Sequence, residues 1–253
     1  MTTITIPWLN PDDPFPPVEQ AIGPGVLAAG ADLSLPRLLD AYSQGLFPWF
    51  SEGEPILWWS PDPRAVLQCN ELKIAKSLAK KCRQIARAET ETTADNQRIT
   101  VTTNTAFLQV ISHCAATRRE QGTWITDNII AAYYQLHKHQ HAHSIEVWQG
   151  TQLVGGLYGI QRGQFFFGES MFSLISDASK VALCYLVTYL QRHLGIQYID
   201  CQQETAHLTS LGAKTISRTD FTKLLAHYTP LATPAWQQGQ LYADGQCRPL
   251  SID

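Results

Sequence analysis

The chain has 253 residues, 44% of them apolar and 10% aromatic, which is enough to bury the core of one large domain, or of a large and a small one. Its formal charge of −3 argues against a protein that binds nucleic acid through net charge alone, and six scattered cysteines without a Cys-x-x-Cys pair indicate neither a disulfide scaffold nor a zinc knuckle. No basic segment followed by an apolar run opens the chain, and its longest apolar run, Val181 to Leu190, is too short to cross a bilayer. We therefore expect a soluble cytoplasmic protein with no membrane partner.

The first quarter of the chain predicts a small domain. Residues 1–33 are rich in proline and glycine and are expected to be irregular or weakly stranded. Ser34 is expected to cap a short helix that ends at Gly45, and the segment ILWWS, after a loop, is typical of a strand. The prolines of Ser60-Pro61-Asp62-Pro63 are the strongest break in the chain. They predict a small N-terminal domain at 1–62 and a larger domain at 63–253.

The larger domain is predicted to mix helices with a mostly antiparallel sheet. The tight links Gly150-Thr151 and Arg162-Gly163 join strands into hairpins, and a helical crossover at 179–193 leads to a further strand. This order indicates an α+β fold and not a doubly wound one. The expected strands are 65–69, 99–102, 144–149, 153–160, 164–167 and 197–201; the expected helices are 72–87, 106–117, 127–137 and 179–193, with two small ones after them.

The helix predicted at 72–87 has a cationic face. At about 100° per residue, five of its basic residues fall on one narrow stripe, and Ile74, Leu78, Cys82 and Ile85 fall on the opposite side. The stripe contains Lys73, Lys76, Lys80, Arg83 and Arg87, with no acid among them. Such a stripe is either an ordinary solvated face or a track for phosphates, and the absence of acids at i,i+4 spacing favours the track.

Polar residues are predicted at the ends of two neighbouring strands. Gly168-Glu169-Ser170 is expected to end one apolar strand, and Asp200 and Gln202 lie at the close of the next. Two such ends can converge on one pocket, although a strand-end hydrogen-bond pair, or an ion pair between Glu169 and an Arg or Lys, is the plainer alternative. Because Asp200 and Gln202 are two residues apart on a strand, they should point the same way, so that Asp200 accepts from the side-chain amide of Gln202.

Two other signals suggest sites less strongly. Four alternating histidines resemble a metal-binding tract, but they span a helix end and a strand start, and no Cys or carboxylate completes the set. They are His137, His139, His141 and His143. Gly155, Gly156 and Gly159 lie inside a hairpin strand, so they predict a bulge or a close approach of backbones and not a dinucleotide-binding loop.

The motifs FPWFS, ILWWSPDPRAVL, GTWIT, HAHSIEVW, LVGGLYG, FFFGESMFS, DASK and IDCQ occur in this order. Through them the chain resembles the bacterial leucyl/phenylalanyl-tRNA–protein transferases from about Gly25 to Leu225. The resemblance implies a small N-terminal domain and a larger acetyltransferase-like (GNAT-like) domain. It also implies transfer of leucine or phenylalanine, and less readily methionine, from aminoacyl-tRNA to proteins with N-terminal Arg or Lys, which marks them for degradation by the N-degron pathway. We expect a monomer that needs no metal and no organic cofactor.

The resemblance also implies roles for residues. The Asp and Gln of IDCQ, here Asp200 and Gln202, orient the attacking amine, and Glu169 lies near the aminoacyl end of the substrate, where it can pair with an ammonium group. The donor side chain is expected in an apolar socket of Trp49, Trp124, Leu157, Met171, Leu186 and Ile199. Leu157 and Leu186 replace the Met and Phe of some relatives, which leaves the preference between phenylalanine and leucine open. The cationic helix would then hold the tRNA acceptor stem.

Two other classes of function compete with this interpretation. A coenzyme-A-dependent N-acyltransferase needs a glycine-rich loop before its pyrophosphate-binding helix, and residues 172–180, FSLISDASK, contain no glycine. A non-catalytic adaptor for basic N-termini or tRNA ends would keep its effect without Asp200 and Gln202. The sequence determines neither the protein targets nor the route of the proton.

Overall fold

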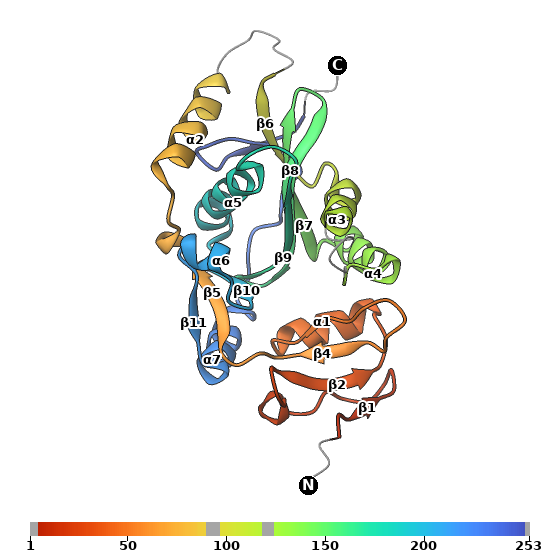
Figure 1. Cartoon of the computed structure of the whole chain (residues 1–253). Coiled ribbons are helices and arrows are strands. Elements are labelled where there is room, and N and C mark those ends of the chain that lie inside the picture. Colours follow the sequence, from red (N-terminus) through yellow and green to blue (C-terminus); the bar gives the residue numbers. More distant parts are fainter. Residues whose placement is uncertain (1–4, 90–96, 118–123, 251–253) are drawn as a thin grey trace.

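The computed structural model describes residues 5–89, 97–117 and 124–250. It is an α+β structure with a small N-terminal sheet and a larger mixed sheet, which confirms the predicted fold class (Figure 1). The two sheets lie one above the other in Figure 1, with the N-terminal sheet at the bottom.

The N-terminal sheet has the strand order β1-β2-β4-β3, and helix α1 (Leu35–Ser43) packs on it. Its strands are β1 (Trp8–Leu9), β2 (Val26–Gly30), β3 (Phe47–Pro48) and β4 (Leu57–Trp59), with a short 3-10 helix η1 (Val18–Gln20) before β2. The helix starts after Ser34 and ends before Gly45, as predicted, and Gly45 adopts φ 78°, which favours glycine. Of the segment predicted at 1–33, the described residues 5–33 are more ordered than expected, since β2 is a fully buried strand.

The segment between the two sheets is held by the start of a late helix, α7 (Arg218–Tyr228). The Arg218 guanidinium donates to the carbonyl oxygen of Ser60 through Nε at 3.0 Å and Nη2 at 2.7 Å, and its backbone N–H donates to Asp62. Strand pairing changes from the first sheet to the second between Trp59 and Arg64. The domain boundary at 62/63 stays a prediction.

In the part of the chain that the structure describes, the larger sheet has nine strands in the order β11-β5-β10-β9-β8-β7-β6-β12-β13. Every neighbouring pair in it is antiparallel except β9 and β10, which are parallel and joined by the crossover helix α5 (Ala178–Tyr189). The strands are β5 (Arg64–Gln68), β6 (Ile99–Thr103), β7 (Ala142–Gln149), β8 (Gln152–Arg162), β9 (Phe165–Ser173), β10 (Tyr198–Gln202), β11 (Lys214–Ile216), β12 (Gly239–Leu241) and β13 (Cys247–Arg248).

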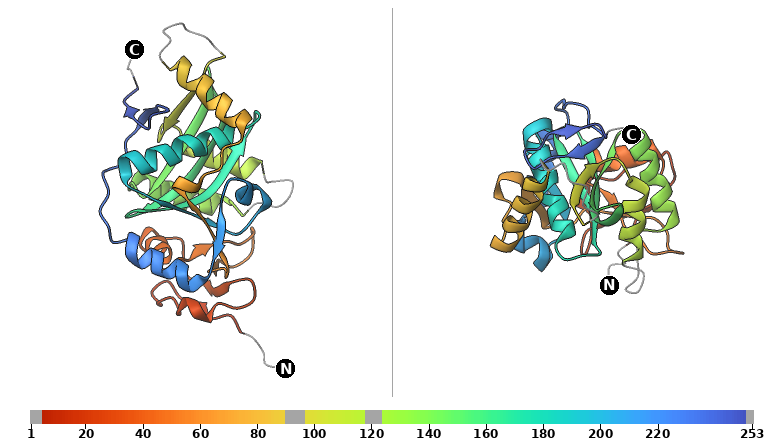
Figure 2. Two further views of the ribbon diagram at one scale, coloured as in Figure 1. Left: turned by 90° about the vertical axis from the view of Figure 1, so that its left-hand side faces the viewer. Right: turned by 90° about the horizontal axis from the view of Figure 1, so that it is seen from above.

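Helices cover both faces of this sheet. The helices α3 (Phe107–Ala116) and α4 (Asp127–Lys138) lie on one face, while α5 and α2 (Lys76–Ala88) lie on the other, as the view from above shows (Figure 2). Each face has its own apolar core, and the core under α3 and α4 is continuous with that of the N-terminal sheet. A 3-10 turn, η2 (Cys69–Glu71), precedes α2, and a short helix, α6 (Ala206–Ser210), follows β10.

Most predicted elements are confirmed. One difference, the extension of β9 to Ser173 beyond the predicted end at residue 167, bears on the site, and three more concern other elements. Helix α2 begins at Lys76, because η2 and an extended link occupy the residues before it, so Ile74 lies outside the helix and is 45% exposed. Helix α5 ends in a π-helical segment, η4 (Leu190–Leu194). The short strands β11, β12 and β13 were not predicted, because two- or three-residue strands show no periodicity.

The glycines of β8 occupy positions where backbones approach closely, as predicted. A Cβ atom at Gly155 would lie 2.4 Å from that of Ala178 at the start of α5, and one at Gly159 would lie 2.2 Å from the carbonyl oxygen of Phe167 on β9. Since no side chain tolerates such distances, glycine at these positions allows β8 to pack against both neighbours.

A buried carboxylate, Glu146 on β7, replaces the missing N-terminal cap of α3. It is 0% exposed and accepts from Ser144 Oγ at 2.5 Å and from Thr102 Oγ1 at 2.5 Å, and the backbone N–H groups of Thr105 and Ala106 also point at it. Burial raises the pKa of Glu146, and the hydroxyl donors oppose that shift. The carboxylate therefore accepts hydrogen bonds from side chains of two strands and from the backbone N–H groups at the start of a helix.

We expect Glu146→Ala to lower the free energy of unfolding by about 3 kcal/mol, because several buried donors lose their acceptor together. Urea unfolding followed by circular dichroism measures this. The matched control is Glu71→Ala, which removes a surface ion pair to Lys214 with partners 38% and 65% exposed and should cost less than about 1 kcal/mol. Equal losses in the two variants would contradict the assigned role of Glu146.

Candidate active site

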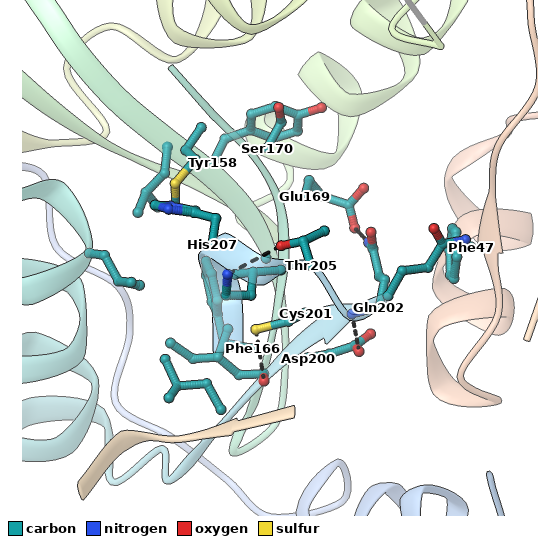
Figure 3. Close-up of a pocket in the computed structure, with 18 of the residues that line it drawn as sticks. Phe47, Tyr158, Phe166, Glu169, Ser170, Asp200, Cys201, Gln202, Thr205 and His207 are labelled. Carbon is teal, nitrogen blue, oxygen red and sulfur yellow. Dashed lines mark hydrogen bonds between the residues drawn. The ribbon is translucent and has the colours of Figure 1, made fainter. Parts of the chain in front are cut away.

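A pocket opens where the parallel strand pair of the larger sheet, β9 and β10, separates. Strands β9 and β10 pair from Tyr198–Phe165 to Asp200–Phe167, after which β9 continues to Ser173 and β10 turns away. A cavity of about 290 Å³ occupies the gap, bounded also by β8, α5, α6 and the loop after β3 (Figure 3). Its wall is mostly apolar, and Glu169, Asp200 and Gln202 form its polar end.

Asp200 forms a buried ion pair with Arg64 on the neighbouring strand β5. Nε and Nη2 of Arg64 donate to Oδ1 and Oδ2 of Asp200 at 2.8 and 2.7 Å, and both side chains are 0% exposed. Two parallel charge-assisted hydrogen bonds fix the plane of the carboxylate as well as its position. The buried ion pair that was the plainer alternative for Glu169 is thus formed by Asp200 instead.

Gln202 lies beyond a bulge of β10, and this corrects the predicted geometry. The register with β5 shifts between Asp200 and Gln202, and Gln202 adopts φ 62°, which non-glycine residues rarely do. Asp200 Oδ1 accepts from the backbone N–H of Gln202 at 2.8 Å, whereas the side-chain amide of Gln202 donates to Glu169 Oε1 at 3.0 Å. The predicted bond between Asp200 and that amide is wrong, because the spacing rule assumes an unbroken strand.

Glu169 is a bulge residue inside β9 and not a strand end as predicted. Tyr158 and Gly159 of β8 pair with Ser170 and Gly168, which leaves Glu169 as the additional residue of β9. This buried carboxyl accepts from Tyr42 of α1 at 2.8 Å and from Tyr133 of α4 at 3.2 Å, and burial is the main reason that its pKa rises to about 8. None of the ion pairs between described residues includes Glu169, so its predicted alternative role as partner of an Arg or Lys is not observed.

The structure brings all six predicted socket residues to the wall of this pocket. They are Trp49, Trp124, Leu157, Met171, Leu186 and Ile199. Trp49 comes from the N-terminal part of the chain and is held in place by Trp59, whose indole N–H donates to its carbonyl oxygen at 2.7 Å. Their place in the pocket is observed, and their contact with a donor side chain stays a prediction.

The cationic stripe is present, although it starts before the helix. Lys73 precedes α2, and all five predicted basic residues, Lys73, Lys76, Lys80, Arg83 and Arg87, are exposed. On the opposite side of α2, Leu78 and Ile85 are buried against α5, with Cys82 half-buried beside them. The predicted amphipathic helix is thus confirmed, and its contact with phosphates stays a prediction.

The alternating histidines serve other contacts. His137 stacks on Phe107 with ring centroids 4.3 Å apart, and His143 stacks on Trp236 at 4.1 Å. Within 5–89, 97–117 and 124–250, no three His, Cys, Asp or Glu side chains gather closely enough to hold a metal ion.

Sequence reasoning missed three residues at the polar end and one on the wall. Arg64, Tyr42 and Tyr133 hold the two carboxyl groups, and His207 of α6 lines the pocket. Arg64 had a signal, since a charged residue directly before the buried run Ala65–Leu67 needs a partner. Tyr42 and Tyr133 lie at ordinary core positions of helices, so nothing in the local sequence indicates that they contact the site.

Comparisons with known proteins give a consistent result. A family model described as "Leucyl/phenylalanyl-tRNA protein transferase" matches residues 66–226, and the model of that family's N-terminal domain matches residues 31–62. A relative from Bordetella petrii, named leucyl/phenylalanyl-tRNA–protein transferase, is 52% identical over 250 residues, covering 98% of this chain and 97% of its own. One from Cupriavidus metallidurans with the same name is 51% identical and covers 91% and 90%.

A solved protein of unknown function from Bacteroides thetaiotaomicron is 14% identical, with a TM-score of 0.38 over 68% of this chain and 57% of its own. That likeness is too weak to test the expected acetyltransferase-like fold, which stays a prediction. Among the described helices, none is both long and apolar enough to cross a membrane.

Proposed function

The chain belongs to the leucyl/phenylalanyl-tRNA–protein transferase family, and we propose that it moves leucine or phenylalanine from aminoacyl-tRNA to the α-amine of proteins that begin with Arg or Lys. Transfer from aminoacyl-tRNA to a protein N-terminus is the activity that family membership supports. The choice of Arg or Lys, the slower use of methionine, and degradation of the product are the finer parts of the proposal, as is a monomeric enzyme in the cytoplasm.

The observation that carries the proposal is an apolar pocket with one polar end. A cavity of about 290 Å³ matches the scale of a single large side chain, and the tryptophans and aliphatic groups of its wall suit both leucine and phenylalanine. Met171 on that wall adapts to either shape because its chain is unbranched and flexible. The ester carbonyl of the donor would then lie toward Glu169, Asp200 and Gln202.

The chemistry requires little beyond positioning, since an aminoacyl ester is already activated. Holding the acceptor amine against the ester carbonyl can supply roughly 7–11 kcal/mol of the barrier. Because Gln202 donates its Nε2 hydrogen to Glu169, its side-chain oxygen remains to accept a hydrogen bond from the attacking amine. An amide is a poor base, so we assign Gln202 orientation and polarisation of the amine.

We assign to Glu169 the binding of an ammonium group, from either the donor amino acid or the acceptor, because its buried carboxyl lies at the polar end of the pocket. With a pKa near 8, it is neutral in the empty pocket at neutral pH. A cation that enters beside it favours the ionised form, so ammonium binding and loss of the Glu169 proton should be linked.

The proposal is tested by transfer of radiolabelled phenylalanine from Phe-tRNA to a protein beginning with Arg, beside the same protein beginning with Ala. Label on the Arg protein alone, lost after ribonuclease treatment of the donor, supports both the donor and the acceptor. Acylation that depends instead on acetyl-coenzyme A would contradict the proposal.

The cationic stripe of α2 is proposed to hold the phosphates of the tRNA acceptor stem. Reversing Lys76, Lys80 and Arg83 to Glu should weaken tRNA binding at least about 10-fold at physiological salt and lower the slope of log Kd against log salt by about 1 per lost contact. Filter binding across a salt series measures both. Lys138, Lys223 and Arg248 reversed to Glu form the control, with the same change of charge outside α2. Equal loss in both triple variants would contradict a specific contact.

A further inference from the structure

The guanidinium of Arg64 is built into the site but lies behind the pocket wall. Asp200 lines the pocket, whereas Arg64 is 0% exposed and lies on β5, on the far side of β10 from β9. Arg64 therefore reaches a substrate only through Asp200.

Two aromatic rings fix the guanidinium from different parts of the chain. Its central carbon lies 4.8 Å from the ring centre of Phe47 in the N-terminal sheet and 4.5 Å from that of Phe221 on α7. Such contacts attract a cation and restrict the plane of the group. Among the described residues, Nη1 has no hydrogen-bond partner, so the side-chain bonds of Arg64 go to Asp200 alone.

The polar end of the pocket holds two buried carboxyl groups and one buried cation. Arg64 forms its ion pair with Asp200, while Glu169 is surrounded by the hydroxyls of Tyr42 and Tyr133 and the amide of Gln202. The cation thus distinguishes the two acids by their partners: Asp200 is held by the guanidinium, and Glu169 is held by neutral donors.

Asp200 connects Arg64 to the backbone turn at Gln202. The Oδ1 atom that accepts from Arg64 Nε also accepts from the backbone N–H of Gln202, whose left-handed φ of 62° turns β10 away from β9. A residue in that region of backbone space persists where its surroundings determine it. The series of hydrogen bonds from Arg64 through Asp200 to the backbone of Gln202 is continuous, and Arg64 and Asp200 are fully buried.

We infer that Arg64 is a positioning residue of the transfer reaction: its fork holds the carboxylate of Asp200, and through it the backbone turn that presents the Gln202 amide to the pocket. This inference rests on the proposed function. A positive charge alone is not sufficient for this role, because a lysine ammonium cannot make the two parallel hydrogen bonds of a guanidinium.

The first test is Arg64→Lys, which keeps the charge and the aliphatic stem and so favours folding. We expect kcat for transfer to fall by about 100-fold, the scale of a misplaced reacting group, while KM for aminoacyl-tRNA stays unchanged because the pocket wall is intact. Wild type is assayed beside it, and its transfer to an Arg-starting protein tests the proposed function separately. A lysine variant with wild-type kcat would overturn the inference.

The second test is chemical rescue of Arg64→Ala. The cavity left between Phe47 and Phe221 fits a guanidinium ion, so added guanidinium, well below denaturing concentrations, should restore at least about one tenth of the lost kcat by reforming the bidentate bonds to Asp200. Urea at equal concentration should not. If Arg64→Ala fails to fold, the lysine variant decides the question.

Arg37→Ala is the matched control. Arg37 is also buried and lies over the ring of Phe15 at 4.6 Å, and within the described part of the chain it donates only to backbone carbonyl oxygens, those of Asn10, Pro11 and Asp13. It should lose stability without losing kcat per folded molecule, and guanidinium should not alter its rate. If folded Arg64→Ala behaves in the same way, Arg64 is structural only and the inference is wrong.

Discussion

Replacing Asp200 by Asn is expected to lower both stability and transfer, by about 3–5 kcal/mol in the free energy of unfolding and about 100-fold in kcat. The change keeps the shape of the side chain but leaves the Arg64 guanidinium buried with no charge to balance it. Asn has one acceptor oxygen for the three donors that Asp200 now serves, namely Arg64 Nε, Arg64 Nη2 and the backbone N–H of Gln202. The turn at Gln202 then loses its anchor.

Two measurements separate these effects. Urea unfolding gives the stability, and single-turnover transfer from Phe-tRNA, well below the unfolding temperature, gives the rate per folded molecule. Asp220→Asn is the control: Asp220 pairs with Lys223 on the surface of α7, with both partners more than half exposed, and its variant should match wild type in both assays. A stable Asp200→Asn protein that transfers at the wild-type rate would remove Asp200 from the mechanism.

Periodicity and turn residues were sufficient to predict most of the fold. The apolar faces of α2, α3 and α4, the tight hairpin links and the break at Ser60–Pro63 are local signals that tertiary contacts reinforce. Strand β2 was expected to be weak at most, because three of its five residues are Ala or Gly and the segment around it is rich in proline and glycine, while its burial depends on β4 and β1. Burial decided by non-local pairing leaves little trace in the local sequence.

Part of the site could be predicted from the sequence, but its hydrogen bonds could not. Asp200, Gln202 and Glu169 do meet at one pocket, yet two bulges, at Glu169 and after Asp200, break the strand periodicity on which the expected geometry depended. A bulge depends on the partner strand and is invisible from one strand alone. The same holds for Tyr42 and Tyr133, which approach Glu169 from two helices 91 residues apart in sequence and share a hydrogen bond.

The ionisation of Glu169 makes stability fall as pH rises. Folded Glu169 keeps its proton up to a pKa of about 8, mainly through burial and also through the nearby charge of Asp200, whereas an unfolded carboxyl loses its proton near 4.5. Between those values the folded state binds one more proton than the unfolded state, so the free energy of unfolding decreases by about 1.4 kcal/mol per pH unit, or about 4 to 5 kcal/mol in total.

Glu169→Gln removes this pH dependence, because the amide stays neutral at every pH. The stability of the variant relative to wild type should therefore improve from about pH 5 to about pH 8, by up to about 4 kcal/mol. Urea unfolding of both proteins at these two pH values gives the difference, and groups that titrate equally in both cancel. A difference that does not change with pH would show that Glu169 is ionised in the folded protein throughout this range.

Relative to the wild type, the same variant should lose more transfer activity at pH 8 than at pH 6. The positive charge of an acceptor ammonium beside residue 169 is balanced only if that side chain can ionise, which an amide cannot do. We therefore expect kcat/KM for the acceptor to fall about 100-fold near pH 8. The loss should shrink toward pH 6, where wild-type Glu169 is also neutral before the acceptor binds. Because KM for aminoacyl-tRNA depends on the apolar wall, it should stay near the wild-type value. A loss that is the same at both pH values would assign Glu169 a steric role, with its proton irrelevant to transfer.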